Sequence, residues 1–490
     1  MTVSNILETL DAFVSSSMER WHTPGLAVAI VQNGEILLTR GFGERNLEHK
    51  QSVTPETRFA IGSCTKAFTA TALAMLVDEG KLDWDKPVRD YLPTFQLYDS
   101  YATIHATTRD LLTHRVGLPR HDLLWYTSAL SRAELVARLR YLEPTREFRQ
   151  TWQYQNLLYM TAGHLLEVIT GQSWESFIQE RIFTPLGMNA SCFDAETARA
   201  SVNCATPYKE ASSGVATMDW YPHWHALGPA GSIHTNVLDM SQWLLLHLQQ
   251  GTYKGQKLLS QAQMREMHTP HVSKPEPRKY SELFFDSYAL GWAVTAYRGH
   301  TLIRHGGNID GFSAQTAFLP DEQAGVVVLT NHNSGPLQSI VAYYILDCLL
   351  GVEPIDWHER AQQEYHQTQE EKSLKTRSRA KDKVLSTKPS HTRDAYTGVF
   401  EHPGYGLITI TDAGENLQLR YNELLFTLHH YHYDSFEMQS ENFDPNMDIL
   451  CTFLTDELGR VTSCNVQFEA TQPALCFVRN NQIGITPVVS

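Results

Sequence analysis

The stretch Phe59-Ala60-Ile61-Gly62-Ser63-Cys64-Thr65-Lys66 leads directly into an alanine- and leucine-rich segment, residues 67–76, and together they decide the fold. Apolar side chains recur there at the spacing of a helix that faces a core, at Phe68, Ala72, Met75 and Leu76. Ser63 is therefore expected at the start of a buried helix, with Lys66 one turn further on and on the same face. A desolvated lysine loses its proton more easily and can serve as base to a serine nucleophile. The unpaired amides at the helix N-terminus, including that of Ser63, can stabilise a developing oxyanion.

The Ser-x-x-Lys spacing occurs a second time, at Ser378-Arg379-Ala380-Lys381. That copy lies in a charged stretch with few apolar residues, where a solvated linker is the better interpretation. The spacing alone is thus a weak signal, and the first copy gains its weight from partners further along the chain.

A second element, Tyr154-Gln155-Asn156, precedes another apolar segment, residues 157–166, that is typical of a core helix. A tyrosine two residues before an asparagine, in a loop entering a helix, can aim a phenol and a carboxamide at one cleft. A phenol near an ammonium is pulled toward phenolate and can move protons. For the isolated tripeptide, the alternative is a packed Tyr154 and an Asn156 that only caps the helix.

A third element, His305-Gly306-Gly307-Asn308, lies among strand-like segments and is followed by Ile309-Asp310-Gly311-Phe312. Two consecutive glycines beside strands indicate a place where the backbone of a substrate approaches closely. The alternative is a hairpin turn with an incidental histidine.

In this order the three elements resemble the S-x-x-K, Y-x-N and K-T-G motifs of penicillin-binding proteins and serine β-lactamases. The sequence around them is similar to the class C β-lactamase-like branch, which includes esterases, D-amino-acid peptidases and penicillin-binding-protein-like hydrolases. The similarity covers residues 8 to 350, and the runs that carry it are Pro24-Gly25-Leu26-Ala27-Val28-Ala29-Ile30-Val31, Asp110-Leu111-Leu112-Thr113-His114-Arg115-Val116-Gly117-Leu118-Pro119, Pro185-Leu186-Gly187-Met188, Gly228-Pro229-Ala230-Gly231-Ser232 and Gly325-Val326-Val327-Val328-Leu329-Thr330-Asn331.

The resemblance implies a role for each matching residue. Ser63 would be the acylated nucleophile, Lys66 its base or proton relay, and Tyr154 a second base that protonates the leaving group and activates the deacylating water. Asn156 would orient the substrate amide. The amides of Ser63 and Asn308 would form the oxyanion hole.

The third motif departs from the pattern of β-lactamases, which carry lysine where this chain has His305, ahead of Gly306 and Gly307. An imidazole is neutral for much of the time near neutral pH, so it would hold a β-lactam carboxylate less firmly than an ammonium. Branches of the family with His-x-Gly are often peptidases or esterases. We therefore favour a peptidase or esterase over a β-lactamase, with His305 touching a substrate carboxylate or acyl oxygen.

Composition fits an ordinary enzyme of 490 residues, of which 42% are hydrophobic. The formal net charge of −14 argues against nucleic acid or an anionic membrane as a partner. Residues 1–20 fit an amphipathic helix rather than a signal peptide, and no run approaches a membrane span. The seven cysteines lack the spacing of metal ligands, so we expect reduced thiols, a cytoplasmic location and no metal or other cofactor.

The order of the elements predicts an α/β (α+β) fold of the serine β-lactamase and penicillin-binding-protein kind, with an antiparallel sheet flanked by helices. Residues 26–32 and 35–41 are strand-like and joined by Asn33-Gly34, a strong hairpin signal. Strand-like runs return at 288–296, 300–304, 313–319 and 325–331, and an apolar helix follows at 336–350. A helical region, 63 to 250, lies between the two sets, and residues 1–353 are assigned to this catalytic domain.

The composition changes sharply after the catalytic domain. Residues 354–390 are strongly charged and predict a linker that is helical in part. Residues 391–490 contain short strands at regular spacing, which predict a small antiparallel barrel. The run His430-Tyr431-His432-Tyr433-Asp434-Ser435-Phe436 resembles the lipocalin-like C-terminal module of some relatives. In those relatives the barrel bears on substrate access and assembly, which implies a possible homo-oligomer here; the alternative is a stabilising appendage.

Several functions remain open at this point. We favour a serine peptidase or amidase on short peptides, which can include D-residues. A carboxylesterase or acyltransferase would use the same acyl-enzyme, and β-lactamase activity is the weaker alternative. A non-enzymatic binding protein is disfavoured because Ser63, Lys66, Tyr154 and Asn156 are all present. The sequence defines neither the physiological acyl group nor its stereochemistry.

Overall fold

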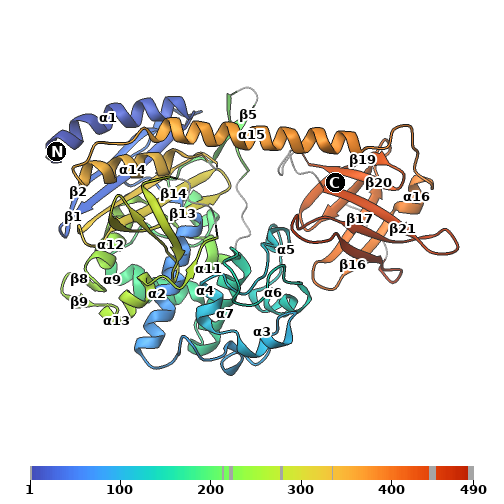
Figure 1. Cartoon of the computed structure of the whole chain (residues 1–490), viewed down its shortest axis with the longest axis horizontal. Coiled ribbons are helices and arrows are strands. Elements are labelled where there is room, and N and C mark those ends of the chain that lie inside the picture. The colour runs from blue at the N-terminus through green and yellow to red at the C-terminus, as the bar shows by residue number, and fades with distance from the viewer. Residues whose placement is uncertain are drawn as a thin grey trace. The chain divides into compact units, whose positions relative to one another are not determined.

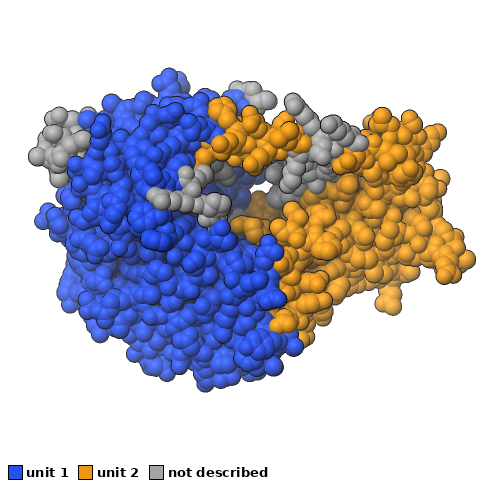
Figure 2. Space-filling view, in the orientation of Figure 1, with its two compact units in different colours: residues 1–95, 100–117, 146–363 blue, residues 96–99, 118–145, 364–490 orange. Residues whose placement is uncertain are grey.

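The computed structural model describes residues 3–211, 214–219, 225–275, 280–333, 335–440 and 449–483, without the side chains of residues 3–8, 372 and 375–381. The chain folds into two compact units (Figures 1 and 2). Unit 1 consists of residues 1–95, 100–117 and 146–363, and unit 2 consists of residues 96–99, 118–145 and 364–490.

The core of unit 1 is a nine-stranded antiparallel sheet (Figure 1). In the order of their pairing, the strands are β10 (Val272–Ser273), β11 (Leu283–Tyr288), β12 (Ala293–Tyr297), β13 (His300–Ile309), β14 (Phe312–Leu319), β15 (Ala324–Thr330), β1 (Gly25–Gln32), β2 (Glu35–Asn46) and β3 (Gln51–Ser52). Early and late parts of the unit meet where β1 pairs with β15, with Val28 opposite Val328. The antiparallel sheet predicted from both ends of this region is thereby confirmed.

Strand β1 shows why the sheet has helices on both faces. Leu26, Val28 and Ile30 share a buried cluster with residues of α1 (Val3–Arg20) and α14 (Leu337–Leu349). Alternate side chains of a strand point to opposite faces, and α12 (Val237–Leu248) contacts β1 and β15 as well. The continuous apolar run of β1 is therefore that of a strand covered on both faces.

The region between β3 and β10 is mainly helical and carries two long helices beside the site. Almost all of α2 (Thr65–Asp78) is buried. Helix α7 (Asn156–Thr170) begins after Gln155, whose side chain accepts a hydrogen bond from the Leu157 amide, and it ends at Gly171 in the left-handed conformation. The other elements of unit 1 outside the sheet are β4 (Phe59–Ala60), η1 (Gly62–Cys64), η2 (Val88–Asp90), α3 (Ser100–His105), α4 (Thr108–Leu112), α8 (Trp174–Ile178), η4 (Gln179–Phe183), α9 (Thr184–Leu186), α10 (Ala195–Arg199), β5 (Tyr208–Ala211), β6 (Gly214–Thr217), α11 (Gly228–Gly231), β7 (His234–Thr235), β8 (Thr252–Tyr253), β9 (Gln256–Lys257) and α13 (Gln261–His268).

Unit 2 is built on a closed antiparallel barrel of eight strands, each paired with its neighbour in sequence. The strands are β16 (Gly398–His402), β17 (Gly406–Asp412), β18 (Leu417–Tyr421), β19 (Leu424–His432), β20 (Ser435–Gln439), β21 (Ile449–Thr455), β22 (Val461–Val466) and β23 (Leu475–Arg479). The barrel closes where β16 pairs with β23, with Phe400 opposite Arg479. This up-and-down arrangement is the architecture of lipocalins, so the predicted C-terminal barrel is confirmed.

Unit 2 also contains a segment from the middle of the chain, residues 118–145. It carries α5 (Asp122–Trp125), α6 (Arg132–Arg138) and η3 (Leu139–Tyr141). Arg138 donates a hydrogen bond to the Gly404 carbonyl at 2.9 Å, and the Asn422 amide donates to the Tyr126 carbonyl at 3.1 Å. The barrel thus packs against a segment that the sequence analysis places in the catalytic domain.

The connecting segment forms helix α15 (Trp357–Asp382), and the short α16 (Arg393–Tyr396) precedes the barrel. None of the helices in the described part of the chain is both long and apolar enough to span a membrane. All seven cysteines are free thiols.

Two details of the sheet differ from the sequence prediction. The run 288–296 is not one strand but the end of β11 and most of β12, with a turn between them. The strand predicted over 300–304 continues as β13 through His305-Gly306-Gly307-Asn308 to Ile309, so the alternative of a hairpin turn at this element is excluded, and the turn falls at Asp310 and Gly311. The glycines of this element therefore act within a strand.

Candidate active site

Ser63 lies in the short turn η1 at the start of α2. The preceding residue Ile61 is anchored because its amide donates to the Ile233 carbonyl at 3.0 Å. Gly62 adopts a left-handed φ of 49°, which lets the chain turn sharply into the helix. Ser63 keeps partial exposure, whereas Gly62 and Cys64 on either side of it are buried. The local sequence thus presents one hydroxyl at the exposed end of a buried helix.

Lys66 is completely buried and reaches three hydrogen-bond acceptors. Its Nζ lies 3.0 Å from Ser63 Oγ, 2.8 Å from Asn156 Oδ1 and 2.8 Å from the Ala230 carbonyl oxygen. These three acceptors are uncharged. A neutral amine in this position would donate its two N–H groups to the amide and the carbonyl oxygens and direct its lone pair at the serine hydroxyl. The geometry therefore suits proton transfer from Ser63 to Lys66.

Tyr154 and Asn156 approach Lys66 from the start of α7. Lys66 Nζ lies 4.9 Å from the centre of the Tyr154 ring. Gln155, not Asn156, caps the helix, so the Asn156 carboxamide is available for its contact with Lys66. The alternative in which Asn156 serves only as a helix cap is thus excluded by the structure.

Gly307 is required by the close packing of β13 against η1, the turn that carries Ser63. A Cβ atom on Gly307 would lie 1.9 Å from the Ile61 carbonyl oxygen and 3.1 Å from the Ser63 amide nitrogen. A Cβ on Gly62 would in turn lie 2.8 Å from the Asn308 amide nitrogen. The amides of Ser63 and Asn308 are therefore close neighbours, as two donors to one oxyanion must be. A Cβ on Gly306 would make only an ordinary contact, 3.5 Å from Gln315.

His305 is buried, with 7% of its surface exposed, and both ring nitrogens have partners. Its Nδ1–H donates to the Gly306 carbonyl at 2.7 Å, which leaves Nε2 to accept from the Tyr288 hydroxyl at 2.8 Å. Burial, with a smaller effect of the Lys66 charge, lowers the pKa of His305 to about 3. Desolvation therefore favours the neutral imidazole of His305 near neutral pH.

Cys64, next to Ser63, is buried, and its thiol donates to the His305 carbonyl at 3.2 Å. Burial raises the pKa of the Cys64 thiol to about 12. The thiolate is the nucleophilic form of cysteine, so burial makes Cys64 a poor nucleophile.

Three further residues contact the site, although the sequence analysis gave them no role. The Ala230 carbonyl in α11 accepts from Lys66. The His114 ring lies 4.4 Å from the Tyr154 ring, and its Nδ1 accepts from the Gln155 amide at 3.1 Å. The Tyr159 ring lies 5.3 Å from Lys66 Nζ. Of these residues, Ala230 and His114 lie within runs that resemble the family, but only the structure shows their contacts.

No group of three or more histidine, cysteine or acidic side chains suited to a metal ion occurs among the described residues. The side chains gathered around Ser63 are an amine, a carboxamide, phenols and imidazoles. This set can add a serine hydroxyl to a carbonyl carbon, hold the oxyanion on two amides and return protons to the leaving group.

Solved structures share this fold over most of the chain. An octameric penicillin-binding protein homologue from Pyrococcus abyssi is 22% identical, has a TM-score of 0.65 and covers 96% of this chain and 99% of its own. A structure of SurE is 19% identical, with a TM-score of 0.59 and coverage of 96% and 98%. A class C β-lactamase from Rhodobacter sphaeroides is 24% identical, with a TM-score of 0.57 and coverage of 70% and 99%. The fold is thus that of penicillin-binding proteins and class C β-lactamases, with a C-terminal barrel added.

Comparison with known sequences matches the catalytic region to a protein family. The Beta-lactamase family matches residues 10–349, and a domain of unknown function (DUF3471) matches residues 382–478. Unguisins hydrolase ungD' of Aspergillus campestris is 30% identical over 433 residues, which are 82% of this chain and 78% of the relative. Unguisins hydrolase ungD of Aspergillus violaceofuscus is 28% identical over 445 residues, with coverage of 82% and 76%. The chain belongs to the Beta-lactamase family and is a serine hydrolase.

The contact at Gly307 generates a first prediction. Gly307→Ala places a methyl group against the Ile61 carbonyl and must push β13 away from η1, the turn that carries Ser63. Because misplacing catalytic groups by about 1 Å can cost on the order of 100-fold, we expect kcat/KM to fall by about that factor. Steady-state kinetics on the best ester or peptide substrate measures the effect. The matched control is Gly306→Ala, which has room for its methyl group and should stay within about fivefold of wild type. A fully active Gly307→Ala enzyme would contradict the packing.

The buried His305 generates a second prediction. With a pKa lowered to about 3, the ring gains its proton only in strong acid and remains neutral from pH 5.5 to 8.5. The KM of a carboxylate-bearing substrate, divided by that of a matched neutral substrate, should therefore stay constant across this range. KM values at half-unit pH intervals test this. A ratio that rises severalfold around pH 6.5 in wild type, and becomes flat in His305→Gln, would show instead a charged imidazolium that holds the carboxylate.

Proposed function

We propose that this chain is a serine peptidase or amidase that forms an acyl-enzyme on Ser63 and acts on short peptides, D-residue-containing peptides among them. The observation that carries the proposal is the Lys66 Nζ to Ser63 Oγ distance of 3.0 Å inside a buried site. The relatives named as hydrolases support transfer of the acyl group to water.

Acylation begins when Ser63 Oγ attacks the carbonyl carbon of the substrate. The hydroxyl proton passes to neutral Lys66, while the carbonyl electron pair moves onto oxygen. Lys66 needs no rearrangement, because the Asn156 and Ala230 oxygens already take its other two N–H groups. The oxyanion would lie between the amides of Ser63 and Asn308, which are fixed by the backbone and need no reorganisation.

The leaving group and the deacylating water then need a second proton carrier, and Tyr154 has that role. Collapse of the tetrahedral intermediate expels the amine, which takes the phenol proton of Tyr154. The resulting phenolate is stabilised by the Lys66 ammonium, whose Nζ lies 4.9 Å from the phenol ring centre. Water attacks the acyl-enzyme and returns its proton to Tyr154, and Lys66 returns its proton to Ser63 Oγ, which restores the starting state.

The third motif gives β-lactamase activity little support. Binding of a β-lactam carboxylate would gain from a permanent cation at this position, and the neutral His305 is instead held by Tyr288 and the Gly306 carbonyl. An esterase would use the same acyl-enzyme with a better leaving group. Esterase activity is therefore the competing outcome of the substrate tests below.

We further propose that the barrel-bearing unit 2 contributes to self-association and that the protein works in the cytoplasm. The octameric state of the Pyrococcus abyssi homologue, whose structure covers 96% of this chain, supports the first point. The free state of all seven cysteines fits the second. Light scattering on the purified full chain would measure the assembly state directly.

The third prediction concerns the nucleophile. Ser63→Ala removes the atom that forms the acyl bond, and loss of a covalent nucleophile costs on the order of 10⁴ to 10⁶ in kcat. A panel of L- and D-peptide p-nitroanilides, p-nitrophenyl esters and nitrocefin measures the loss and identifies the preferred class. Mass spectrometry of the wild-type chain after brief exposure to the best substrate should show the acyl group on Ser63.

The same experiment tests the substrate class and the identity of the nucleophile separately. Turnover of esters alone would replace the peptidase by an esterase and leave Ser63 in place. A Ser63→Ala variant with activity within tenfold of wild type, after contamination is excluded, would contradict the acyl-enzyme itself. Circular dichroism of the variant shows whether the fold is intact.

The fourth prediction is that Lys66 and Tyr154 act as one proton-transfer unit. Lys66→Ala and Tyr154→Phe should each lower kcat about 100-fold or more, with smaller changes in KM. The double variant should lose much less than the product of the two single losses, because removing either residue already breaks the relay. Fully multiplicative losses in this cycle would mean that the two residues work independently.

A further inference from the structure

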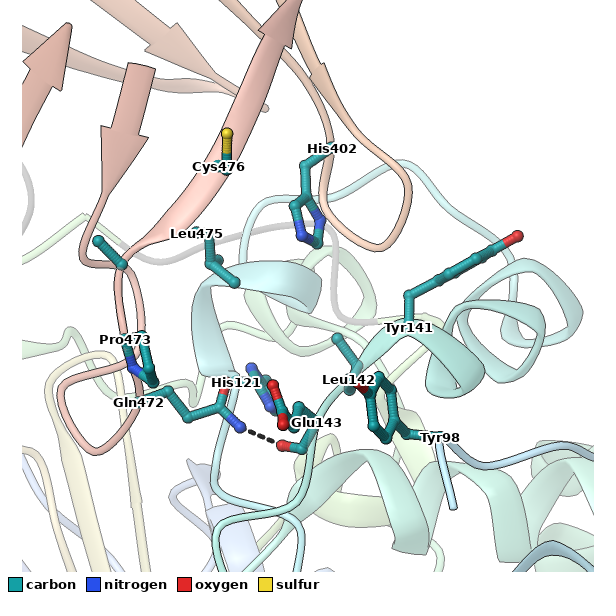
Figure 3. A pocket seen from close by; sticks show the side chains of 11 residues that line it. Tyr98, His121, Tyr141, Leu142, Glu143, His402, Gln472, Pro473, Leu475 and Cys476 are labelled. Atoms are coloured by element: carbon teal, nitrogen blue, oxygen red, sulfur yellow. Dashed lines mark hydrogen bonds between the residues drawn. The ribbon is translucent and has the colours of Figure 1, made fainter. Parts of the chain in front are cut away.

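Unit 2 contains a cavity that the catalytic mechanism does not use. Its volume is about 260 Å³, and it lies between the barrel and residues 118–145 of the same unit (Figure 3). Two histidines, His121 and His402, line it together with Glu143 and the aromatic side chains Tyr98 and Tyr141. An apolar part of the wall includes Leu142, Pro473 and Leu475. The volume suits a molecule the size of one amino acid or a very short peptide.

His402 has its proton position fixed by the backbone around it. Its Nδ1 accepts hydrogen bonds from the amides of Gly404 and Tyr405, each at 3.1 Å. A ring nitrogen that accepts carries no proton, so the proton of the neutral ring is on Nε2. Burial, with a contribution from Arg138, lowers the pKa of His402 and favours this neutral form. His402 therefore offers the cavity one N–H donor.

His121 has no exposed surface and is held on several sides. Its backbone has a left-handed φ of 48°, and its amide donates to the Glu469 carboxylate at 3.0 Å. The Tyr405 hydroxyl lies 2.7 Å from Nδ1. Tyr405 is buried, and its hydroxyl has no other hydrogen-bond partner among the described residues, so the phenol satisfies its own proton by donating it to Nδ1. The proton of the neutral imidazole is then on Nε2.

That Nε2 is buried and has no hydrogen-bond partner among the described residues. Burial lowers the pKa of His121 to about 4 against the opposing effect of Glu469, and a charge on the nearby His402 would lower it further. A buried donor without an acceptor is costly, and a buried polar atom in the wall of a cavity is satisfied when a ligand supplies the acceptor. His121 thus places a second N–H, without an acceptor among the described residues, in the wall of the cavity.

Besides the N–H donors, the cavity is lined by a carboxylate and by aromatic rings. Glu143 supplies a carboxylate, and the Gln472 side chain donates to its backbone carbonyl, which ties the barrel loop to the Glu143 segment (Figure 3). Tyr98 and Tyr141 add ring faces, which attract cations. The cavity therefore combines two N–H donors from neutral rings with one negative charge and aromatic faces.

We propose that this cavity binds a free α-amino acid or very short peptide in its zwitterionic form. The ligand carboxylate accepts from Nε2–H of His121 and His402, the ligand ammonium pairs with Glu143 beside the tyrosine rings, and an aliphatic side chain packs on Leu142 and Leu475. A plain anion would lack compensation for Glu143, and a plain cation or an apolar molecule would leave the two imidazole donors unpaired.

The test is isothermal titration of the purified full chain with leucine and with two analogues that each lack one charge. N-acetylleucine has no ammonium and leucinamide has no carboxylate, and each should bind at least tenfold more weakly than leucine. Both enantiomers of leucine are titrated, and binding of either one supports the site. The proposal is overturned if neither enantiomer binds in the millimolar range, or if an analogue binds as tightly as leucine.

Variants locate the binding in unit 2 rather than in the catalytic cleft, where a hydrolysis product could also bind. Glu143 is exposed, so Glu143→Gln should fold normally and weaken leucine binding at least tenfold, with peptidase or esterase turnover unchanged. The matched control is Glu457→Gln, an exposed glutamate of the same unit outside the cavity, which should bind leucine normally. The second cavity variant, His402→Leu, removes one of the two N–H donors and should also weaken leucine binding. Unchanged leucine affinity in both cavity variants would overturn the site, whatever the outcome of the Ser63 experiments.

Discussion

The buried amino group of Lys66 is the constraint on which the catalytic region depends. An amine with no access to water must find acceptors inside the protein, and here they come from three separate parts of the chain: Ser63, Asn156 and Ala230. The N-terminus of α7 and the short helix α11 must therefore lie close to α2. The capping of α7 by Gln155 has the same consequence, because it leaves the Asn156 carboxamide for the lysine.

A second constraint joins the helical region to the sheet. Gly307 of β13 lies so close to Ile61 that any side chain would collide with backbone, and backbone cannot yield as a flexible side chain can. Strand β13 and the turn η1 are therefore positioned by direct contact rather than through intervening side chains. The close approach brings two amides, of Ser63 and Asn308, near each other, and the rigidity of the sheet holds one of them in place.

The sequence predicts the parts of this site whose signal is local. Ser63 and Lys66 are one helical turn apart, and the apolar periodicity after them shows that the helix is buried, so their proximity follows from helix geometry alone. The antiparallel sheet and the closed barrel were predictable for the same reason, since strand spacing and hairpin signals are short-range. The contact of the Ala230 carbonyl with Lys66 was not predictable, because a backbone oxygen has no sequence signal. The union of residues 118–145 with the barrel also depends on contacts far apart in sequence, such as that between Arg138 and Gly404.

His305 shows how burial refines an inference drawn from residue type. A histidine in a motif that otherwise carries lysine suggests a weaker, titratable cation, but desolvation and the Tyr288 contact make it neutral. The surroundings of Lys66 then consist of a neutral ring, phenols and amides. In these surroundings the positive charge that a proton from Ser63 would create on Lys66 is balanced most directly by the oxyanion formed in the same step.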